Sequence, residues 1–305
     1  MKTSLPTFFL AAAIGCTALS GTAFAQSANA DTGTVQQDDG ALARIAASRK
    51  LRTLSQRIPA SACHLVAGVE RDVSADLLTT AIAQIDATLD ALEFGNADLN
   101  ITGAETRRKT INAIEGIRDR WTPLKTAAEA VRSGENADAN LQLIIDQNAA
   151  TLAAIEQLIV EVVGQYSNPT QMVDADSFLI DIAGRQAMLI QQMSKNACLM
   201  STNHSAPETA ENFLSAISVF DASLGALRNG MPSAGVRPPP TPAIADGLDQ
   251  VSAEWTAMKP TLEAIAQGTA PIGEATTSTF QELNALMATT NDVLDSYSVA
   301  LVSAD

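Results

Sequence analysis

The sequence predicts an all-α protein made of two tandem up-down four-helix bundles, and three observations indicate this. First, a shift of 135 residues superimposes the middle of the chain on a second copy, so that Leu54 and Cys63 fall on Leu189 and Cys198. Second, apolar residues recur at helical spacing from residue 41 onward. Third, aromatic residues make up only 4% of the chain, which is typical of helix bundles rather than sandwiches or barrels. Internal duplication therefore sets the predicted architecture.

The first 40 residues are predicted to lie outside the bundles. Residues 1–25 combine a short basic start, an apolar run and the small-x-small sequence Ala23-Phe24-Ala25, which predicts a secretory signal peptide. Residues 26–40 are small, polar and aperiodic, and are interpreted as a flexible leader. A minor alternative is a lipoprotein anchored at Cys16. Either way the protein is expected in the periplasm.

Each repeat is predicted to contain four helices, with the first bundle over 41–166 and the second over 171–303. The correspondence between the repeats continues through the later helices with shifts of a single residue. Trp121 matches Trp255 at a separation of 134 residues, and Asn148 matches Asn284 at a separation of 136 residues. Each repeat is long enough for a self-sufficient domain. The predicted helices are 42–67, 75–94, 103–133, 137–164, 175–202, 207–229, 242–267 and 272–302.

The first helix of each repeat carries two stripes. One is apolar and includes Leu51, Leu54 and Ile58, as expected of bundle-core positions. The other stripe is polar, and it is free to contact groups outside the helix's own bundle. Its members in the two repeats include Arg49, Arg52, Gln56, Cys63, Gln191 and Cys198.

The first helices also carry a recognisable motif. Residues 183–195 (AGRQAMLIQQMSK), and more loosely residues 48–58 (SRKLRTLSQRI), resemble the signature of the extracytoplasmic N-terminal domain of type IV pilus methyl-accepting chemotaxis transducers. That signature is related to the first-helix motif of nitrate/nitrite sensor kinases. The motif is short and made of common helix residues, but it recurs in both repeats.

The resemblance implies a ligand site where two parallel first helices meet. In the nitrate-sensing relatives, an arginine three residues after the motif's glycine binds the anion, and the matching positions here are Arg52 and Ala187. A symmetric two-arginine clamp is therefore not expected. Arg49 could add a second donor fork, since guanidinium groups suit small planar oxyanions. The tentative ligand residues are Arg49, Arg52, Gln56 and Gln191. The alternative is that these arginines are solvated or pair with the abundant acids.

Cys63 and Cys198 occupy equivalent positions in the two repeats. If the first helices pack side by side and parallel, imitating the dimer of the relatives within one chain, the two cysteines are candidates for a disulfide. The alternative is two buried thiols in separate bundles. Bundles arranged end to end would hold them too far apart to bond.

Charge and motif content exclude several function classes. A formal net charge of −15 disfavours binding to nucleic acid or anionic lipid. Neither metal-binding nor haem-attachment spacings occur, and His64 and His204 are expected to be helix-end or surface residues. Catalytic signatures are also absent. No metal, cofactor or enzymatic activity is therefore expected.

The sequence favours an exported, non-catalytic sensory or ligand-binding module. Its expected ligand is a small anion such as nitrate or nitrite, bound near the first helices. With no anchoring helix, kinase or methyl-accepting coiled coil recognisable in the sequence, it is expected to report to a separate partner. The alternative is a structural or interaction protein of the cell envelope that keeps the fold without a small ligand and docks on a membrane receptor or envelope complex.

Overall fold

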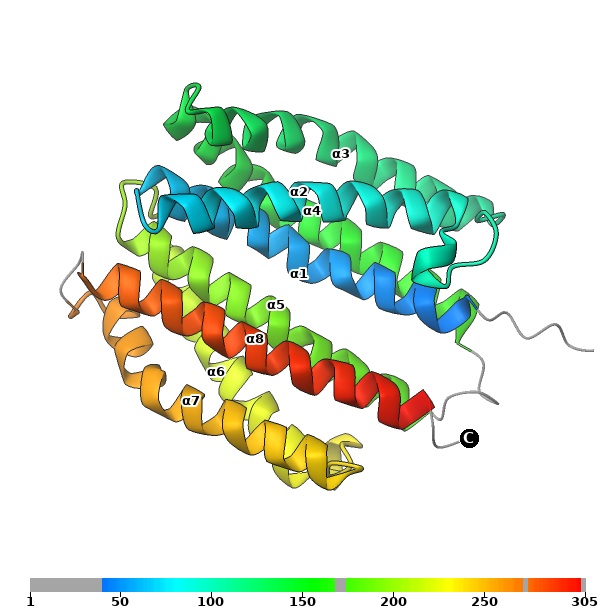
Figure 1. Ribbon diagram of the computed structural model, residues 1–305. Coiled ribbons are helices and arrows are strands. Elements are labelled where there is room, and N and C mark those ends of the chain that lie inside the picture. Colours follow the sequence, from blue (N-terminus) through cyan, green and yellow to red (C-terminus); the bar gives the residue numbers. More distant parts are fainter. Residues whose placement is uncertain (1–39, 168–173, 271–273, 303–305) are drawn as a thin grey trace, which may run out of the picture. The chain divides into compact units, whose positions relative to one another are not determined.

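The computed structural model describes residues 40–167, 174–270 and 274–302, and the described residues form one compact all-helical unit. The predicted signal peptide, residues 26–39 of the predicted leader, and Cys16 lie outside the described residues. Eight α-helices and two short 3₁₀ turns make up the described chain (Figure 1). In order these are α1 (Ala41–Val66), α2 (Arg71–Phe94), η1 (Ala97–Leu99), α3 (Arg108–Ser133), α4 (Ala137–Tyr166), α5 (Asp174–Met200), α6 (Thr209–Asn229), η2 (Pro232–Ala234), α7 (Pro242–Ala266) and α8 (Glu274–Val302).

The predicted helices are present, and the largest boundary differences lie in the first repeat. α3 begins at Arg108 rather than at residue 103, because Glu105 holds the preceding segment in a turn. One carboxylate oxygen of Glu105 accepts hydrogen bonds from the backbone N–H groups of Thr106 and Arg107, both at 2.8 Å. α2 begins at Arg71 rather than at residue 75.

Two hydrophobic cores, one in each repeat, hold the helices together. α1–α4 pack around the first core and α5–α8 around the second, confirming the predicted pair of four-helix bundles. The apolar stripe of α1 faces inward as predicted, with Leu51, Leu54 and Ile58 at most 2% exposed. The first core also includes Cys198 and Leu199 of α5, so it continues across the junction between the bundles.

The same polar contact occurs once in each bundle. In the first, the Trp121 indole and the Lys125 ammonium both donate to the Asp86 carboxylate, each at 2.7 Å. In the second, Trp255 and Lys259 donate to Asp221 at 2.7 and 2.9 Å. Because a tryptophan and a lysine one turn apart meet an aspartate on the neighbouring helix in both halves, the duplication extends to individual hydrogen bonds.

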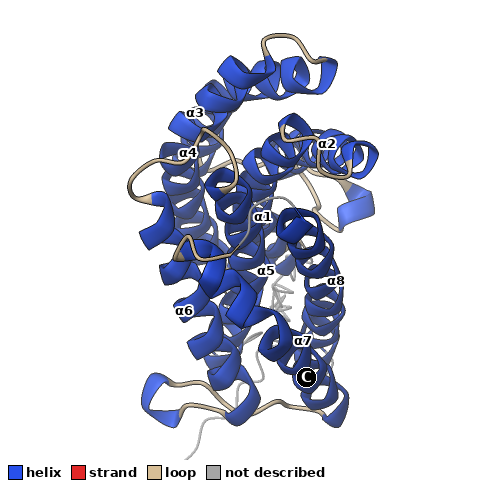
Figure 2. Cartoon of the chain, turned by 90° about the vertical axis from the view of Figure 1, so that its left-hand side faces the viewer, coloured by secondary structure: helices blue, strands red, loops and turns tan. Residues whose placement is uncertain are grey.

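α1 and α5 lie side by side at the centre of the unit and join the two bundles (Figure 2). They run in the same direction, because contacts between them advance together along both helices: Arg52 meets Asp181, Gln56 meets Lys195, and Cys63 meets Cys198. An up-down bundle ends beside its own start, so the second repeat begins where α1 began. The bundles are therefore arranged side by side rather than end to end.

In the described part of the chain, one helix, α4, has the length and composition of a membrane span. These properties are weak evidence, since a core helix of a water-soluble bundle shares them. Polar groups of α4 point into the bundle: Asn148 donates to a backbone carbonyl of α1, and Glu156 pairs with Arg52. α4 therefore functions as a packed bundle helix in this fold.

Candidate functional site

Arg52, the residue matched to the anion-binding arginine, is buried at the seam between α1 and α5 and paired within the chain. Its side chain is 1% exposed. Nε and Nη2 donate to the two oxygens of Glu156 at 2.7 and 2.9 Å, and Nη1 donates to Asp181 at 3.1 Å. Burial opposes the charge of Arg52, but these hydrogen bonds and carboxylates raise its pKa above the ordinary value. Two carboxylates thus already hold the guanidinium.

Gln56 also makes its hydrogen bonds inside the protein. Its side chain is buried, donates to Ser55 Oγ at 3.3 Å and accepts from the Lys195 ammonium at 2.9 Å. Lys195 donates again to Asn148 Oδ1 at 2.8 Å, and burial lowers its pKa to about 8. Gln191, the counterpart of Gln56, is buried as well, at 5% exposed. Both glutamines thus belong to the interior of the seam.

Pro59 lies within α1, and the helix continues through it. Proline has no backbone N–H, so the carbonyl of Ser55, four residues earlier, lacks its helical donor. Asn148 of α4 supplies the missing hydrogen bond from Nδ2 at 2.8 Å. The proline is thereby accommodated through a side chain of another helix.

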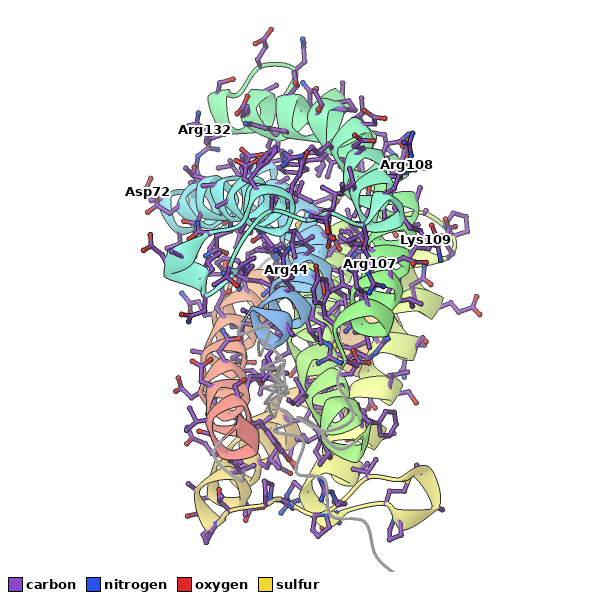
Figure 3. All side chains as sticks on the ribbon, turned by 90° about the vertical axis from the view of Figure 1, so that its right-hand side faces the viewer. Arg44, Asp72, Arg107, Arg108, Lys109 and Arg132 are labelled. Atoms are coloured by element: carbon purple, nitrogen blue, oxygen red, sulfur yellow. A yellow bond between two sulfur atoms is a disulfide. The ribbon has the colours of Figure 1, made fainter. Side chains whose placement is uncertain are left out.

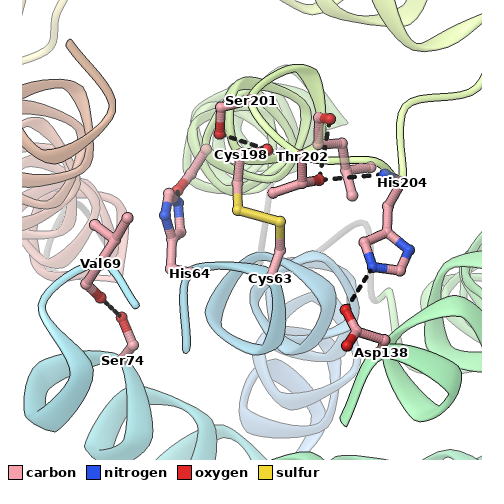
Figure 4. Close-up of a disulfide and its surroundings, with 11 residues drawn as sticks. Cys63, His64, Val69, Ser74, Asp138, Cys198, Ser201, Thr202 and His204 are labelled. Atoms are coloured by element: carbon pink, nitrogen blue, oxygen red, sulfur yellow. Dashed lines mark hydrogen bonds and ion pairs between the residues drawn. A yellow bond between two sulfur atoms is a disulfide. The ribbon is translucent and has the colours of Figure 1, made fainter. Parts of the chain in front are cut away.

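Cys63 and Cys198 are joined by a disulfide that links α1 to α5 (Figure 4). The S–S distance is 2.09 Å, and both residues are fully buried. His64, expected at a helix end or surface, is instead 1% exposed because α5 and Phe280 of α8 cover it. Its Nε2 lies 3.1 Å from Ser194 Oγ, and burial lowers its pKa to about 4. His204 lies 3.3 Å from the Asp138 carboxylate.

A groove of about 450 Å³ runs beside the seam, between α1, α2, α5 and α8. Arg49 is the one predicted ligand residue of the four that lines it, and its Nε also lies 3.4 Å from Asp181. Within the described chain, no three His, Cys, Asp or Glu side chains group as a metal site would require. The groove is lined by Ala46, Arg49, Lys50, Thr53, Leu54, Arg57, Gln84, Ile180, Gly184, Ala187, Met287, Asn291, Leu294, Asp295, Tyr297 and Ser298.

Two polar residues of the groove were not singled out from the sequence. Arg57 is half-buried, and no described residue accepts a hydrogen bond from its buried Nε. Burial lowers the pKa of Arg57. Tyr297 is 1% exposed, its hydroxyl likewise has no partner among the described residues, and burial raises its pKa to about 12. Arg57 lies inside the motif of the first helix, but nothing in the sequence pairs it with a tyrosine 240 positions later.

Other arginines of α1 contrast with Arg57. Arg44 donates to the carbonyls of Leu92 and Gly103, at 2.9 and 2.5 Å, and lies over the ring of Tyr166. Arg52 is paired with two carboxylates. Buried guanidinium groups are ordinarily satisfied in this way. The unsatisfied Arg57 therefore marks the groove as the part of the seam suited to an added anion.

The two halves of the chain match the same protein family. The family described as "PilJ: Type IV pili methyl-accepting chemotaxis transducer N-term" matches residues 34–146 and again residues 170–280. The two matches begin close to the first helices α1 and α5. No curated protein matches the chain.

Proposed function

Because the chain belongs, in both of its repeats, to the family of N-terminal domains of type IV pili methyl-accepting chemotaxis transducers, we propose that it binds a small oxyanion beside its first helices and reports the binding to a separate partner. Domains of this family are non-catalytic sensory modules and are typically extracytoplasmic. In this proposal residues 1–25 direct export to the periplasm.

The observation that carries the proposal is the groove beside α1 and α5 with the unpartnered Arg57 at its wall. Three cationic side chains and one carboxylate line the groove: Arg49, Lys50, Arg57 and Asp295. The chain as a whole has a formal net charge of −15, so this local excess of positive charge runs against the overall composition. A guanidinium partly removed from water gains most from an anion that offers paired oxygen acceptors.

The four tentative ligand residues differ in their roles in this proposal. Arg49 donates hydrogen bonds to the anion together with Arg57, which was not among the four. Arg52 and Gln56, already bonded to other residues, hold α1 and α5 in register rather than touch the ligand. Gln191 remains a predicted contributor with no contact assigned. Nitrate and nitrite are the oxyanions that the resemblance to nitrate sensors implies.

A thermal-shift screen tests this function. The full chain is mixed with nitrate, nitrite and acetate at constant ionic strength, and the same series is run on Arg57→Gln. An anion at 100 times its dissociation constant stabilises the folded state by about 2.7 kcal/mol, so the melting temperature rises in the native chain and not in the variant.

Arg132→Gln is the matched control, since it removes one positive charge from an exposed residue that projects from the end of α3 (Figure 3). It is expected to retain the full shift. Equal shifts in native protein and Arg57→Gln would place the anion elsewhere, and no shift with any anion would contradict the binding function.

The second candidate is a structural or interaction protein of the cell envelope that keeps the fold without a small ligand. The internal pairing of Arg52, Gln56 and Lys195 favours it, because the seam is largely satisfied without a ligand. Its acidic surface would dock on a membrane receptor or envelope complex. This candidate requires that none of the anions changes the melting temperature.

A further inference from the structure

The two sides of the α1–α5 seam are related by the duplication but carry different chemistry. On one side lies an ion cluster in which Arg52 pairs with Glu156 and Asp181. Arg185 completes the cluster, 2.9 Å from Asp181 and 3.6 Å from Glu156. These four charged side chains fill this side of the seam, and Arg49 Nε also lies 3.4 Å from Asp181.

The counterparts of that cluster, 135 residues away, all line the groove on the other side. Burial supports this register for α4 and α8, since Ile155, Leu158 and Val162 are buried and so are the residues 135 positions later. Small or neutral side chains stand at three of the four positions. The pairs are Arg52 with Ala187, Asp181 with Ala46, Glu156 with Asn291, and Arg185 with Lys50.

The groove is therefore the space that an ion cluster would fill if the two repeats were identical. On the groove side, the short side chains of Ala187 and Ala46 stand where the cluster has Arg52 and Asp181. Asn291 stands where the cluster has the carboxylate of Glu156. Arg57 supplies a cation to this side, where burial lowers its pKa and no nearby carboxylate raises it. The seam thus holds Glu156 and Asp181 against guanidinium groups on one side and lacks the counterparts of these two carboxylates on the other.

We propose that the groove binds an organic monocarboxylate whose carboxylate takes the place of the missing acidic side chains, next to Arg57, while its apolar body lies against the groove walls. This inference rests on the proposed oxyanion-binding function and narrows the class of ligand. Leu54, Ile180, Met287 and Leu294 provide the apolar walls.

Size and wall chemistry favour an organic ligand over an inorganic oxyanion. Small-molecule sites typically enclose about 300 to 1,000 Å³ and combine apolar walls with a few polar groups, and the groove of about 450 Å³ fits that description. Nitrate would satisfy the guanidinium groups but leave the apolar walls of the groove uncovered. Asp295, exposed at the α8 edge of the groove, disfavours a second carboxylate on the ligand.

Tyr297 gives a second polar contact. Its buried hydroxyl has no partner among the described residues, and such a group is costly unless an added acceptor satisfies it. α8 runs antiparallel to α1, and His64 of α1 packs against Phe280 of α8. Tyr297 therefore lies near the level of Ala46, about 15 Å along the groove from Arg57. Its hydroxyl can donate to a neutral polar group at the far end of a longer ligand, but not to the carboxylate beside Arg57.

Isothermal titration calorimetry on the full chain tests the inference. The probes are butyrate, hexanoate, benzoate and phenylacetate, with benzamide as a neutral analogue of benzoate and nitrate as the inorganic comparison. At least one monocarboxylate is expected to bind about tenfold or more tightly than nitrate, and benzoate more tightly than benzamide, because a charge-assisted hydrogen bond is lost in the amide.

Three variants separate the contacts. Arg57→Gln, which installs the residue found at the duplicate position 192, is expected to weaken carboxylate binding about tenfold or more, whereas Arg132→Gln leaves it unchanged. Ala187→Leu shortens the groove without changing charge and is expected to exclude the organic probes but not nitrate. Tyr297→Phe is expected to leave the affinity for these short probes unchanged while raising the melting temperature of the free protein by roughly 2 to 4 °C, since it deletes an unsatisfied buried hydroxyl.

The failures of the two proposals differ. Arg57-dependent binding of nitrate, with none of the four monocarboxylates binding more tightly, would overturn the carboxylate inference and keep the oxyanion function. No binding of any anion would overturn both. If Arg57→Gln loses its helical circular dichroism signal, Ala187→Leu decides, because unchanged monocarboxylate affinity in that variant, with its helical signal retained, contradicts the proposed site.

Discussion

Buried charges in this protein are stabilised in two different ways at the level of single residues. Arg52 is surrounded by two carboxylates, so its charge is neutralised locally. Lys195 instead donates to the side-chain carbonyl oxygens of Gln56 and Asn148. Dipoles compensate a buried ammonium less completely than a carboxylate does. The pKa of Arg52 is accordingly raised while that of Lys195 is lowered to about 8.

Arg52→Ala is expected to destabilise the protein by about 3 kcal/mol, near the lower end of the range for breaking a buried ion pair. The low end applies because Glu156 and Asp181 keep side-chain exposures of 31% and 22%, so water partly solvates them afterwards. Urea denaturation measures the loss. Arg185→Ala, whose side chain is 44% exposed, serves as the control and is expected to cost less than about 1 kcal/mol. Equal costs for both variants would contradict the assigned role of Arg52.

Because the pKa of Lys195 is lowered, the free energy of unfolding is expected to rise with pH. The pKa of Lys195 in the folded protein is about 8, below the ordinary lysine value of 10.5, so between these pH values the unfolded chain keeps a proton that the folded chain has released. Stability then increases as pH rises from 8 toward 10.5, by up to about 1.4 kcal/mol per pH unit. Urea denaturation at pH 7.5 and 10 measures the increase.

Lys195→Met is expected to lack this increment, while Lys50→Met, at an exposed position, retains it. The pH profile rather than absolute stability is the readout, because Lys195→Met also leaves the Gln56 and Asn148 oxygens without their donor. Parallel pH profiles for native protein and Lys195→Met would contradict the buried ammonium.

Pro59 and Asn148 show how two helices share one hydrogen-bond requirement. The proline removes the donor that the Ser55 carbonyl needs, and Asn148 of α4 replaces it. In the second repeat Ser194 stands in place of Pro59, so no carbonyl loses its donor. Leu283 then occupies the buried position equivalent to Asn148. The sequence match of Asn148 with Asn284, at a separation of 136 residues, is therefore wrong for these helices. Their buried positions correspond at a separation of 135 residues, which pairs Asn148 with Leu283.

A double-mutant cycle tests this coupling. Asn148→Leu, which copies the second repeat, is expected to cost about 1 to 3 kcal/mol because it leaves a buried carbonyl unsatisfied. In a Pro59→Ala background the restored N–H of residue 59 serves that carbonyl, so the same substitution is expected to cost at least about 1 kcal/mol less. Additive effects in urea denaturation would show that the two residues act independently.

At the scale of the whole molecule, the α1–α5 pair and one disulfide form the main link between the two bundles. α1 and α5 supply most of the helix contact between the repeats, and Cys63–Cys198 closes a loop with a sequence separation of 135 residues. A cross-link of this span restricts the unfolded chain strongly. The groove on one side of the seam depends on that pairing, so its stability bears directly on ligand binding.

The Cys63→Ser/Cys198→Ser double variant is expected to lose about 2 to 4 kcal/mol of stability while retaining its helical circular dichroism signal, since each bundle keeps its own core. Urea denaturation with and without a thiol reductant measures this. The reductant should destabilise the native chain and leave the variant unchanged. Insensitivity of the native chain to a reductant under denaturing conditions would contradict the cross-link.

Local patterns in the sequence determined the fold class and much of the internal symmetry. Helical spacing of Leu51, Leu54 and Ile58 predicted the core face of α1, because a helix must bury its apolar stripe. Duplication predicted two bundles and placed Cys63 and Cys198 at equivalent positions, and the family motif in the first helices indicated a sensory domain.

Tertiary packing decided which polar residues of the seam remain available to a ligand. Arg49, Arg52 and Arg57 belong to one helix and look alike in sequence, but Glu156 and Asp181 neutralise Arg52 from other helices. Tyr297 reaches the groove from the far end of the chain. Helical periodicity shows which face of a helix a residue occupies, but not which side chain of a distant helix will meet it, because that depends on how the two bundles are brought together. For this reason the sequence and its family resemblance predicted Arg52, with Arg49, Gln56 and Gln191, as tentative anion ligands, whereas the site proposed from the packed structure is the groove beside Arg57.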